Sequence, residues 1–172
     1  MRPRVPTVAL ATLSCVVTCL SACGVQPHHT LNAASVSHEI ASQLSDRYPV
    51  GSPTVNCPTG VADTAGATFV CSTVLDGQPV HMDGTVTGSN GQFTVVPDAA
   101  IIPIASATSL LTQDITNQTH VRPRVDCGTL RVAVVAIGRS ISCSATFPGQ
   151  KPRKVTVTVT DRQGDVRYTL AP

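Results

Sequence analysis

The sequence is poor in aromatic residues, with no tryptophan, two tyrosines and three phenylalanines among 172 residues. Proteins that bind single-stranded nucleic acid stack bases on exposed aromatic side chains, and this chain has few to offer. Charge is also sparse, since only 13% of residues are Asp, Glu, Lys or Arg and the formal net charge is +2. The composition therefore predicts no nucleic-acid partner.

Motifs for catalysis are missing as well. Glu39 is the only glutamate, and the chain has no Gly-x-Ser-x-Gly elbow, His-Glu-x-x-His helix or phosphate-binding loop. His81 and Asp83 are two residues apart on a predicted strand and share one face, but no third ligand accompanies them. His28 and His29 lie in the short segment after Cys23, where a solvated linker is expected, and His38 and His120 have no recognisable partners. We predict a protein that is not an enzyme and holds no cofactor and no metal.

The N-terminus has the pattern of a processing signal. Arg2 and Arg4 open an apolar run that ends at Leu20, shorter than the roughly 20 residues that a spanning helix needs. The tetrapeptide Leu20-Ser21-Ala22-Cys23 resembles the bacterial lipoprotein signal, in which the cysteine receives a diacylglyceryl group and becomes the new N-terminus. Ordinary secretion with cleavage after Ala22 is the alternative.

From this resemblance we predict a cleaved signal peptide at 1–22, lipid attachment at Cys23 and a tether over 23–31. Two or more acyl chains hold a protein stably at a bilayer. The expected location is the cell membrane, on its extracytoplasmic face, with the lipid as the membrane contact.

Four cysteines remain once Cys15 and Cys19 are removed with the signal and Cys23 is blocked by lipid. They are Cys57, Cys71, Cys127 and Cys143. In an oxidising compartment, paired thiols are expected. Four cysteines allow three connectivities, so a further argument is needed to choose one.

An internal repeat supplies that argument. Val55-Asn56-Cys57 matches Val125-Asp126-Cys127, and the matches continue at Cys71 with Cys143 and at Thr85 with Thr158, at offsets of 70, 72 and 73 residues. Ordered matches with small drift are typical of a duplicated unit with loop insertions. We predict units at 32–99 and 100–172. A unit duplicated as a whole carries its own bridge, which favours Cys57–Cys71 and Cys127–Cys143.

Both units have the same hydrophobic pattern. Apolar residues recur every three or four positions over 32–48, before Pro49, and over 106–119, which predicts two helices. The pattern then alternates with period two, and the cysteines fall on the inward side. The predicted fold class is α+β, with two tandem units. Each unit is one helix packed on a four-stranded antiparallel β-meander with one intra-unit disulfide.

The combined motifs resemble a known domain. A Val-x-Cys-Pro or Val-x-Cys-Gly strand, a Gly-x-x-hydrophobic-x-Cys strand and a Val-Thr-Val-Thr hairpin recur over 31–97 and 104–172. This arrangement is similar to the small cysteine-paired domain of unknown function common in actinobacterial, especially mycobacterial, lipoproteins. The second unit departs from it by carrying Gly128 where the first has Pro58. The resemblance implies a fold and an envelope location, and no chemistry.

The two units carry opposite charge. Residues 24–99 hold one arginine against six acids, and residues 100–172 hold nine basic residues against four acids. Complementary packing of one unit on the other is one interpretation. The other is a basic interaction face for anionic lipid, polysaccharide or an acidic partner. Its candidate residues lie in two proline-containing loops: Arg122, Arg124, Lys151, Arg153 and Lys154.

Two classes of function stay open. The first is a lipid-anchored envelope protein that acts as a non-catalytic binding or adaptor module and recognises an envelope protein or anionic envelope component through a sheet face or edge. The alternative is a carrier that holds an envelope lipid or small apolar ligand in a cleft of the sheets. The apolar run from Val132 to Ile137 suggests the carrier.

Overall fold

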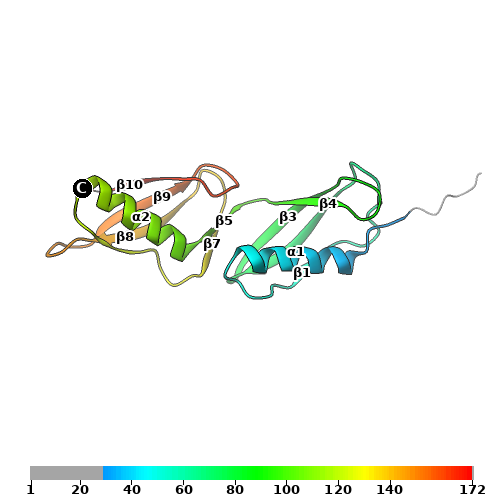
Figure 1. The fold of residues 1–172 in the computed structure, drawn as a ribbon, viewed down its shortest axis with the longest axis horizontal. Coiled ribbons are helices and arrows are strands. Elements are labelled where there is room, and N and C mark those ends of the chain that lie inside the picture. Colours follow the sequence, from blue (N-terminus) through cyan, green and yellow to red (C-terminus); the bar gives the residue numbers. More distant parts are fainter. Residues whose placement is uncertain (1–28, 172) are drawn as a thin grey trace, which may run out of the picture.

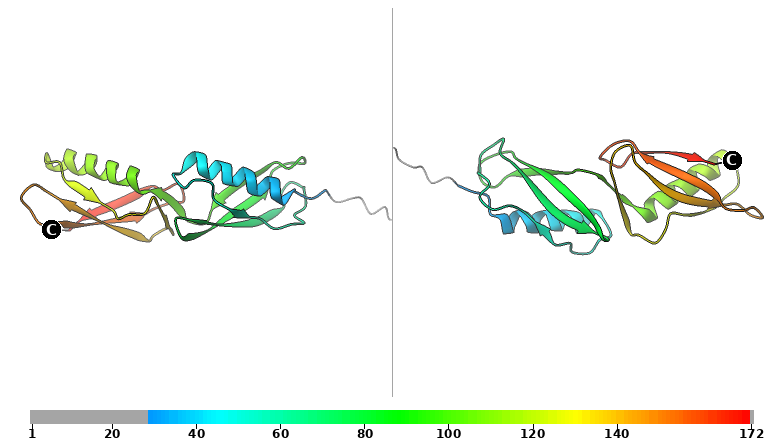
Figure 2. Two further views of the ribbon diagram at one scale, coloured as in Figure 1. Left: turned by 90° about the horizontal axis from the view of Figure 1, so that it is seen from below. Right: turned by 180° about the vertical axis from the view of Figure 1, so that it is seen from behind.

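The computed structural model describes residues 29–171 and shows two units lying end to end (Figure 1). Each unit has a helix packed against an antiparallel sheet, and both helices lie on the same side of the molecule (Figure 2, left). The α+β class is therefore confirmed, with two units of similar plan. The predicted signal peptide at 1–22, lipid attachment at Cys23 and His28 lie outside the described residues.

The first unit consists of one helix and four strands. They are α1 (Ala33–Arg47), β1 (Val55–Asn56), β2 (Thr68–Leu75), β3 (Gln78–Val86) and β4 (Phe93–Pro97). The strands pair in the order β1-β2-β3-β4, all antiparallel. This is the predicted meander.

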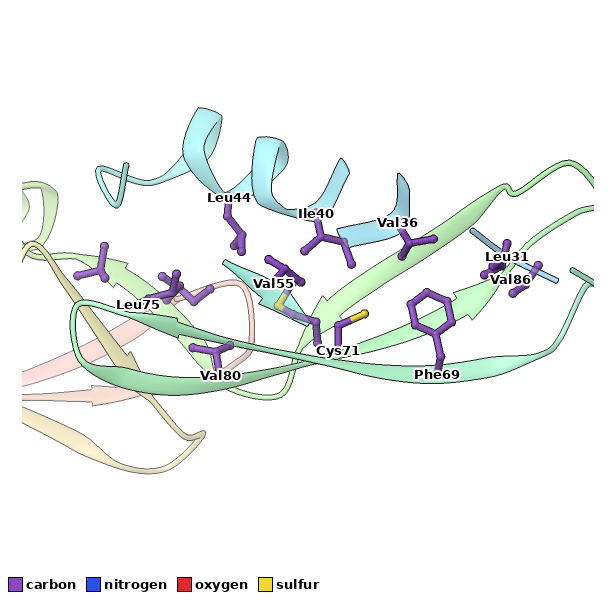
Figure 3. Close-up of a cluster of buried hydrophobic side chains, with 13 residues drawn as sticks. Leu31, Val36, Ile40, Leu44, Val55, Phe69, Cys71, Leu75, Val80 and Val86 are labelled. Atoms are coloured by element: carbon purple, nitrogen blue, oxygen red, sulfur yellow. The ribbon is translucent and has the colours of Figure 1, made fainter. Parts of the chain in front are cut away.

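Helix α1 forms where the sequence predicts it, within one residue at each end. Val36, Ile40 and Leu44 are buried at intervals of four residues, so one stripe of the helix faces the sheet (Figure 3). The Asn32 side chain accepts a hydrogen bond of 3.1 Å from the backbone N–H of Ser35, which satisfies one of the free donors of the first turn. Tyr48, next to Pro49, is extended and ends the helix.

The second unit repeats this plan with one change. Its elements are α2 (Ile104–Thr119), β6 (Arg124–Asp126), β8 (Ser140–Thr146), β9 (Arg153–Val159) and β10 (Val166–Leu170), with strand order β10-β9-β8-β6. Between β6 and β8, strand β7 (Val132–Val135) leaves the sheet and pairs with β5 (Ala100–Pro103). The four predicted strands of this unit therefore pair in the predicted order, and β7 is an additional strand between β6 and β8 that the sequence did not predict.

The apolar run that suggested a ligand cleft has a structural explanation. Val132, Ala133 and Val135 in β7 are all buried, and Val132 belongs to the core of the first unit together with Ile101 from β5. A strand that is apolar on both faces is covered from both sides. The two-stranded sheet of β5 and β7 thus links the cores of the two units.

Both predicted disulfides are present, Cys57–Cys71 and Cys127–Cys143, with Cα atoms 4.3 Å and 4.1 Å apart. In the first unit Asn56 pairs with Ser72, so Cys57 lies directly opposite Cys71. Asp126 pairs with Ser144 in the second unit and places its cysteines in the same relation. Each bridge therefore joins a short edge strand to the middle of its sheet.

The units are docked through polar contacts of the β2–β3 hairpin. The Gln78 side chain donates to the backbone carbonyl of Val132 (2.9 Å) and accepts from the backbone N–H of Val134 (3.0 Å). In this way it satisfies two backbone groups of the β7 edge.

Two ion pairs also cross between the units. Asp76 accepts the backbone N–H of Arg131 at 2.5 Å and lies 3.5 Å from its guanidinium, while Arg162 lies 3.8 Å from Asp83. The hydrogen bond from the Arg131 backbone is the main reason that the pKa of Asp76 lies below its ordinary value. Complementary charge is therefore used between the units, by Arg131 and Arg162.

Replacing Gln78 with alanine is expected to lower the free energy of unfolding by about 1–3 kcal/mol, because it leaves two backbone groups of β7 without partners. Urea unfolding of the full chain followed by circular dichroism measures the change. Gln43→Ala is the matched control: Gln43 is exposed on α1 and bonds only Glu39 within the described chain. A Gln78 variant as stable as the control would contradict this role.

Candidate binding groove

Helix α2 does not cover its whole sheet. It packs over β6 and β5 and leaves a groove of about 360 Å³ between itself and the strands β9 and β10. The groove is lined by Ala107, Leu110, Leu111, Gln113, Asp114, Asn117, Val157, Val166 and Tyr168. Leu110 and Val166 are 65% and 39% exposed, so the lining is apolar and open to solvent. Open apolar surface of this kind marks candidate binding sites.

Two residues of the groove lining, Asp114 and Tyr168, belong to a polar cluster. The Tyr168 hydroxyl donates to a carboxylate oxygen of Asp114 at 2.6 Å and accepts from the Gln118 amide at 2.8 Å. Partial burial, followed by the hydrogen bond to Asp114, raises the pKa of Tyr168 to about 12. The phenol therefore stays protonated near neutral pH and keeps β10 linked to α2.

The first unit has no groove of this size at the equivalent place because larger side chains fill it. Strand pairing defines the equivalence: Val86 lies opposite Phe93 in the first unit, and Val159 lies opposite Val166 in the second. Phe93 packs edge-on against Phe69, with ring centroids 5.9 Å apart. A pocket of about 70 Å³ is left beside β4 in the first unit.

Two further positions follow the same pattern. Phe69 lies opposite Gly84, whereas Ile141 lies opposite Val157. On the helices, Val36 is buried four residues before Ile40, and Ala107 stands four residues before the buried Leu111. The second unit thus carries smaller side chains at these three positions. It carries larger ones at Val157, Tyr168 and Leu170, which stand where the first unit has Gly84, Val95 and Pro97, and the space between α2 and β10 beside Val166 is open.

Sequence reasoning did not predict this groove. The signal was present in the repeat, since aligning the units by their turn glycines sets Phe93 against Val166 and Pro97 against Leu170. Interpreting it, however, required knowing which strand lies at the sheet edge and how far α2 extends across the sheet.

The five predicted basic residues lie toward the end of the second unit that is remote from the first. Strands β8 and β9 are joined there by the loop that contains Lys151 (orange tip in Figure 1). Lys154 pairs with Ser144 on the outer side of the sheet, but Arg153 pairs with the buried Ala145. Arg153 also lies 5.9 Å over the Phe147 ring and donates to the Ala171 carbonyl.

The five residues therefore do not form one uniform face. Within residues 29–171, none of them makes an ion pair with a carboxylate. The ion pairs between the units are made by Arg131 and Arg162 instead of by these five residues.

The histidine positions give no ligand set. His81 lies 3.3 Å from Asp98, and Asp83 faces Arg162. His120 ends α2 in a left-handed conformation, whereas His29 and His38 are exposed. Among residues 29–171, no group of three or more metal-ligating side chains is close enough to hold an ion.

Comparison with known proteins finds a similarity for the first part of the chain. Residues 11–91 match a domain of unknown function, DUF4333. No curated protein and no solved structure gives a significant match. Over residues 29–171, neither helix combines the length and apolarity needed to cross a bilayer.

Proposed function

We propose that this protein is a lipid-anchored, non-catalytic binding module of the cell envelope, held on the extracytoplasmic face of the membrane through Cys23. The support for the anchor is the Leu20-Ser21-Ala22-Cys23 motif at the end of a short apolar run. Two intra-unit disulfides are in keeping with an oxidising compartment. The resemblance to actinobacterial lipoproteins supports the same location.

The binding site of this proposal is the groove between α2 and β10. The observation that carries it is the contrast between the units: one fills the space beside its last strand with Phe69 and Phe93, and the other leaves about 360 Å³ open. The second unit is in this interpretation a diverged copy of the first. The apolar lining of the groove would bind an envelope protein, and the first unit would act as a rigid spacer between the groove and the membrane.

A carrier of an envelope lipid or small apolar ligand is the second candidate. The apolar lining formed by Leu110, Leu111 and Val166 favours it. A lipid would use only the side chains of the groove, however, whereas a protein segment would also use the backbone of β10.

Substituting Val166 with phenylalanine tests the site by restoring the side chain of the first unit. The full chain and its variants are crosslinked in the intact envelope, and captured proteins and lipids are identified. We expect Val166→Phe to reduce the captured amount of the wild-type partner about tenfold or more, because a bulky ring occupies the groove.

Val121→Phe is the matched control, because Val121 has a similar exposed fraction, 43% against 39% for Val166, and lies outside the groove. It should capture the partner as wild type does. Equal capture by both variants would reject the groove. If the Val166→Phe variant loses only the captured lipids and keeps the captured proteins, the protein is a lipid carrier and not a protein-binding module.

A further inference from the structure

Strand β10 is a free edge of its sheet. In the described part of the chain it pairs only with β9. The backbone N–H of Thr160 donates to the backbone carbonyl of Asp165, and the backbone N–H of Ala171 donates to that of Lys154, each at 2.8 Å. Antiparallel ladders alternate between bonded and non-bonded residues, so Arg167 and Thr169 bond β9. The N–H and C=O groups of the alternate residues point away from the sheet: Val166, Tyr168 and Leu170.

The first unit blocks this same edge. There the backbone N–H of Thr87 donates to the backbone carbonyl of Gln92 at 2.9 Å. By the same alternation, the backbone polar groups of Phe93, Val95 and residue 97 point away from the sheet. Residue 97 is proline, which has no N–H to donate, and proline at such a position is a common protection against strand addition. Pro97 lies opposite Met82 and Leu170 lies opposite Val155. The second unit therefore has leucine, with a free N–H, where the first has proline.

The open edge and the apolar groove adjoin. Val166 and Tyr168 turn their side chains into the groove and their backbone groups toward the edge. A strand added antiparallel to β10 would bond these three residues and send its own bonded side chains to the same side of the sheet. Those side chains would lie beside Leu110 under α2, in space that is now open.

The charge of the second unit indicates which side chains the added strand would carry on its other face. Arg167 is exposed on the other face of β10, and residues 100–172 hold nine basic residues against four acids. An added strand would place its second set of side chains beside Arg167, where carboxylates are favoured. Two copies of this unit, each with this excess of positive charge, would repel one another. The charge therefore favours an acidic partner over a second copy.

We propose that β10 receives an extended segment of a partner protein, with apolar residues alternating with acidic ones, as a fifth antiparallel strand of the second sheet. This proposal rests on the proposed function and specifies the partner of the same groove. Backbone hydrogen bonds supply affinity in such complexes, and the pockets for alternate side chains supply specificity.

The probe is a C-amidated peptide, Glu-Val-Glu-Leu-Glu-Val-Glu, that carries fluorescein on its N-terminal nitrogen. It is titrated against the full chain as isolated from membranes, with anisotropy as the readout. Methylating the backbone nitrogens of its three apolar residues removes the donors that face β10 and should weaken binding about tenfold or more. Methylating three acidic residues instead should change affinity less than about threefold. Equal effects of the two methylation patterns, or no effect of either, would overturn strand addition.

Leu170→Pro copies the first unit and should weaken the unmodified peptide about tenfold, whereas Leu170→Ala, which keeps the N–H, should retain most of the affinity. Equal binding by both variants would overturn the proposal, and the methylated peptides test it even if the proline variant folds poorly. A peptide with lysine for glutamate should bind at least about threefold more weakly. If it binds equally, the acidic character of the partner is wrong.

Self-association of the protein that Leu170→Pro abolishes would establish a second copy as the occupant and overturn the partner segment. The outcomes also separate the two proposals. If the two methylated peptides bind with equal affinity while Val166→Phe still loses its envelope partner, strand addition is wrong and the groove remains the binding site. If the envelope partner is retained by Val166→Phe, the groove itself is not the site.

Discussion

Removing the first disulfide, by Cys57→Ala with Cys71→Ala, is expected to lower the free energy of unfolding by about 3 kcal/mol. The bridge closes a loop with a sequence separation of 14 and so restricts the unfolded chain. Cys71 is also fully buried in the first core. A unit of roughly 70 residues has little other apolar surface to bury, so this loss is a large part of its stability.

Urea unfolding of the oxidised full chain measures this effect. The pair Cys127→Ala with Cys143→Ala, at a separation of 16, should cost a similar amount because the two loops are of nearly equal length. Ser72→Ala, on the exposed side of β2 next to Cys71, controls for substitution in that strand. A loss below about 1 kcal/mol for either double variant would show that the bridges do not stabilise their units as proposed.

Substituting Gly84 with valine is expected to destabilise the protein by about 1–3 kcal/mol or more through overpacking. A Cβ atom at Gly84 would lie 2.3 Å from the ring of Phe69, so the ring must move out of the core. The second unit carries the compatible pair, Ile141 opposite Val157. Phe69→Ile should therefore relieve the strain of Gly84→Val.

The four proteins of this double-mutant cycle are compared by urea unfolding. We expect the cost of Gly84→Val to be smaller by at least about 1 kcal/mol when Phe69→Ile is present. Thr85→Val, on the exposed side of the same strand, should change stability by less than about 0.5 kcal/mol. Strictly additive effects would show that Phe69 and Gly84 are not a matched pair and would weaken the comparison between units on which the groove rests.

Local patterns in the sequence predicted much of the fold. The period of Val36, Ile40 and Leu44 located α1 to within a residue at each end, because a buried helical stripe has one spacing. The repeat predicted both disulfides, and the equivalent strands of the two units have the same register, which places the cysteines opposite each other. The start of α2 was predicted at residue 106 and lies at Ile104, directly after Pro103.

Features that depend on packing between distant segments were not predicted. The pairing of β5 with β7 joins residues about 30 positions apart, and an apolar run such as Val132–Val135 fits several burial arrangements equally well. Opposite net charges on the two units favoured docking, but contacts depend on individual positions, and Arg131 and Arg162 are the residues that make the ion pairs with the acidic unit. The groove depends on where α2 lies over its sheet.

The contrast between the units suggests a division of roles. The first unit closes its sheet with Phe69 and Phe93 and protects its edge with Pro97, which suits a stable support. In the second unit, the small side chain of Val166 and the unprotected edge keep both apolar surface and backbone groups available beside β10.

The most direct test of strand addition at β10 is residue-resolved amide hydrogen exchange of the full chain, without and with saturating Glu-Val-Glu-Leu-Glu-Val-Glu peptide. We expect the amides of Val166, Tyr168 and Leu170 to exchange faster than those of Arg167 and Thr169 in the free protein, because only the latter bond β9. With peptide, all five should become protected. Equal protection of the five amides in the free protein, or unchanged exchange at Val166, Tyr168 and Leu170 with peptide bound, would contradict strand addition.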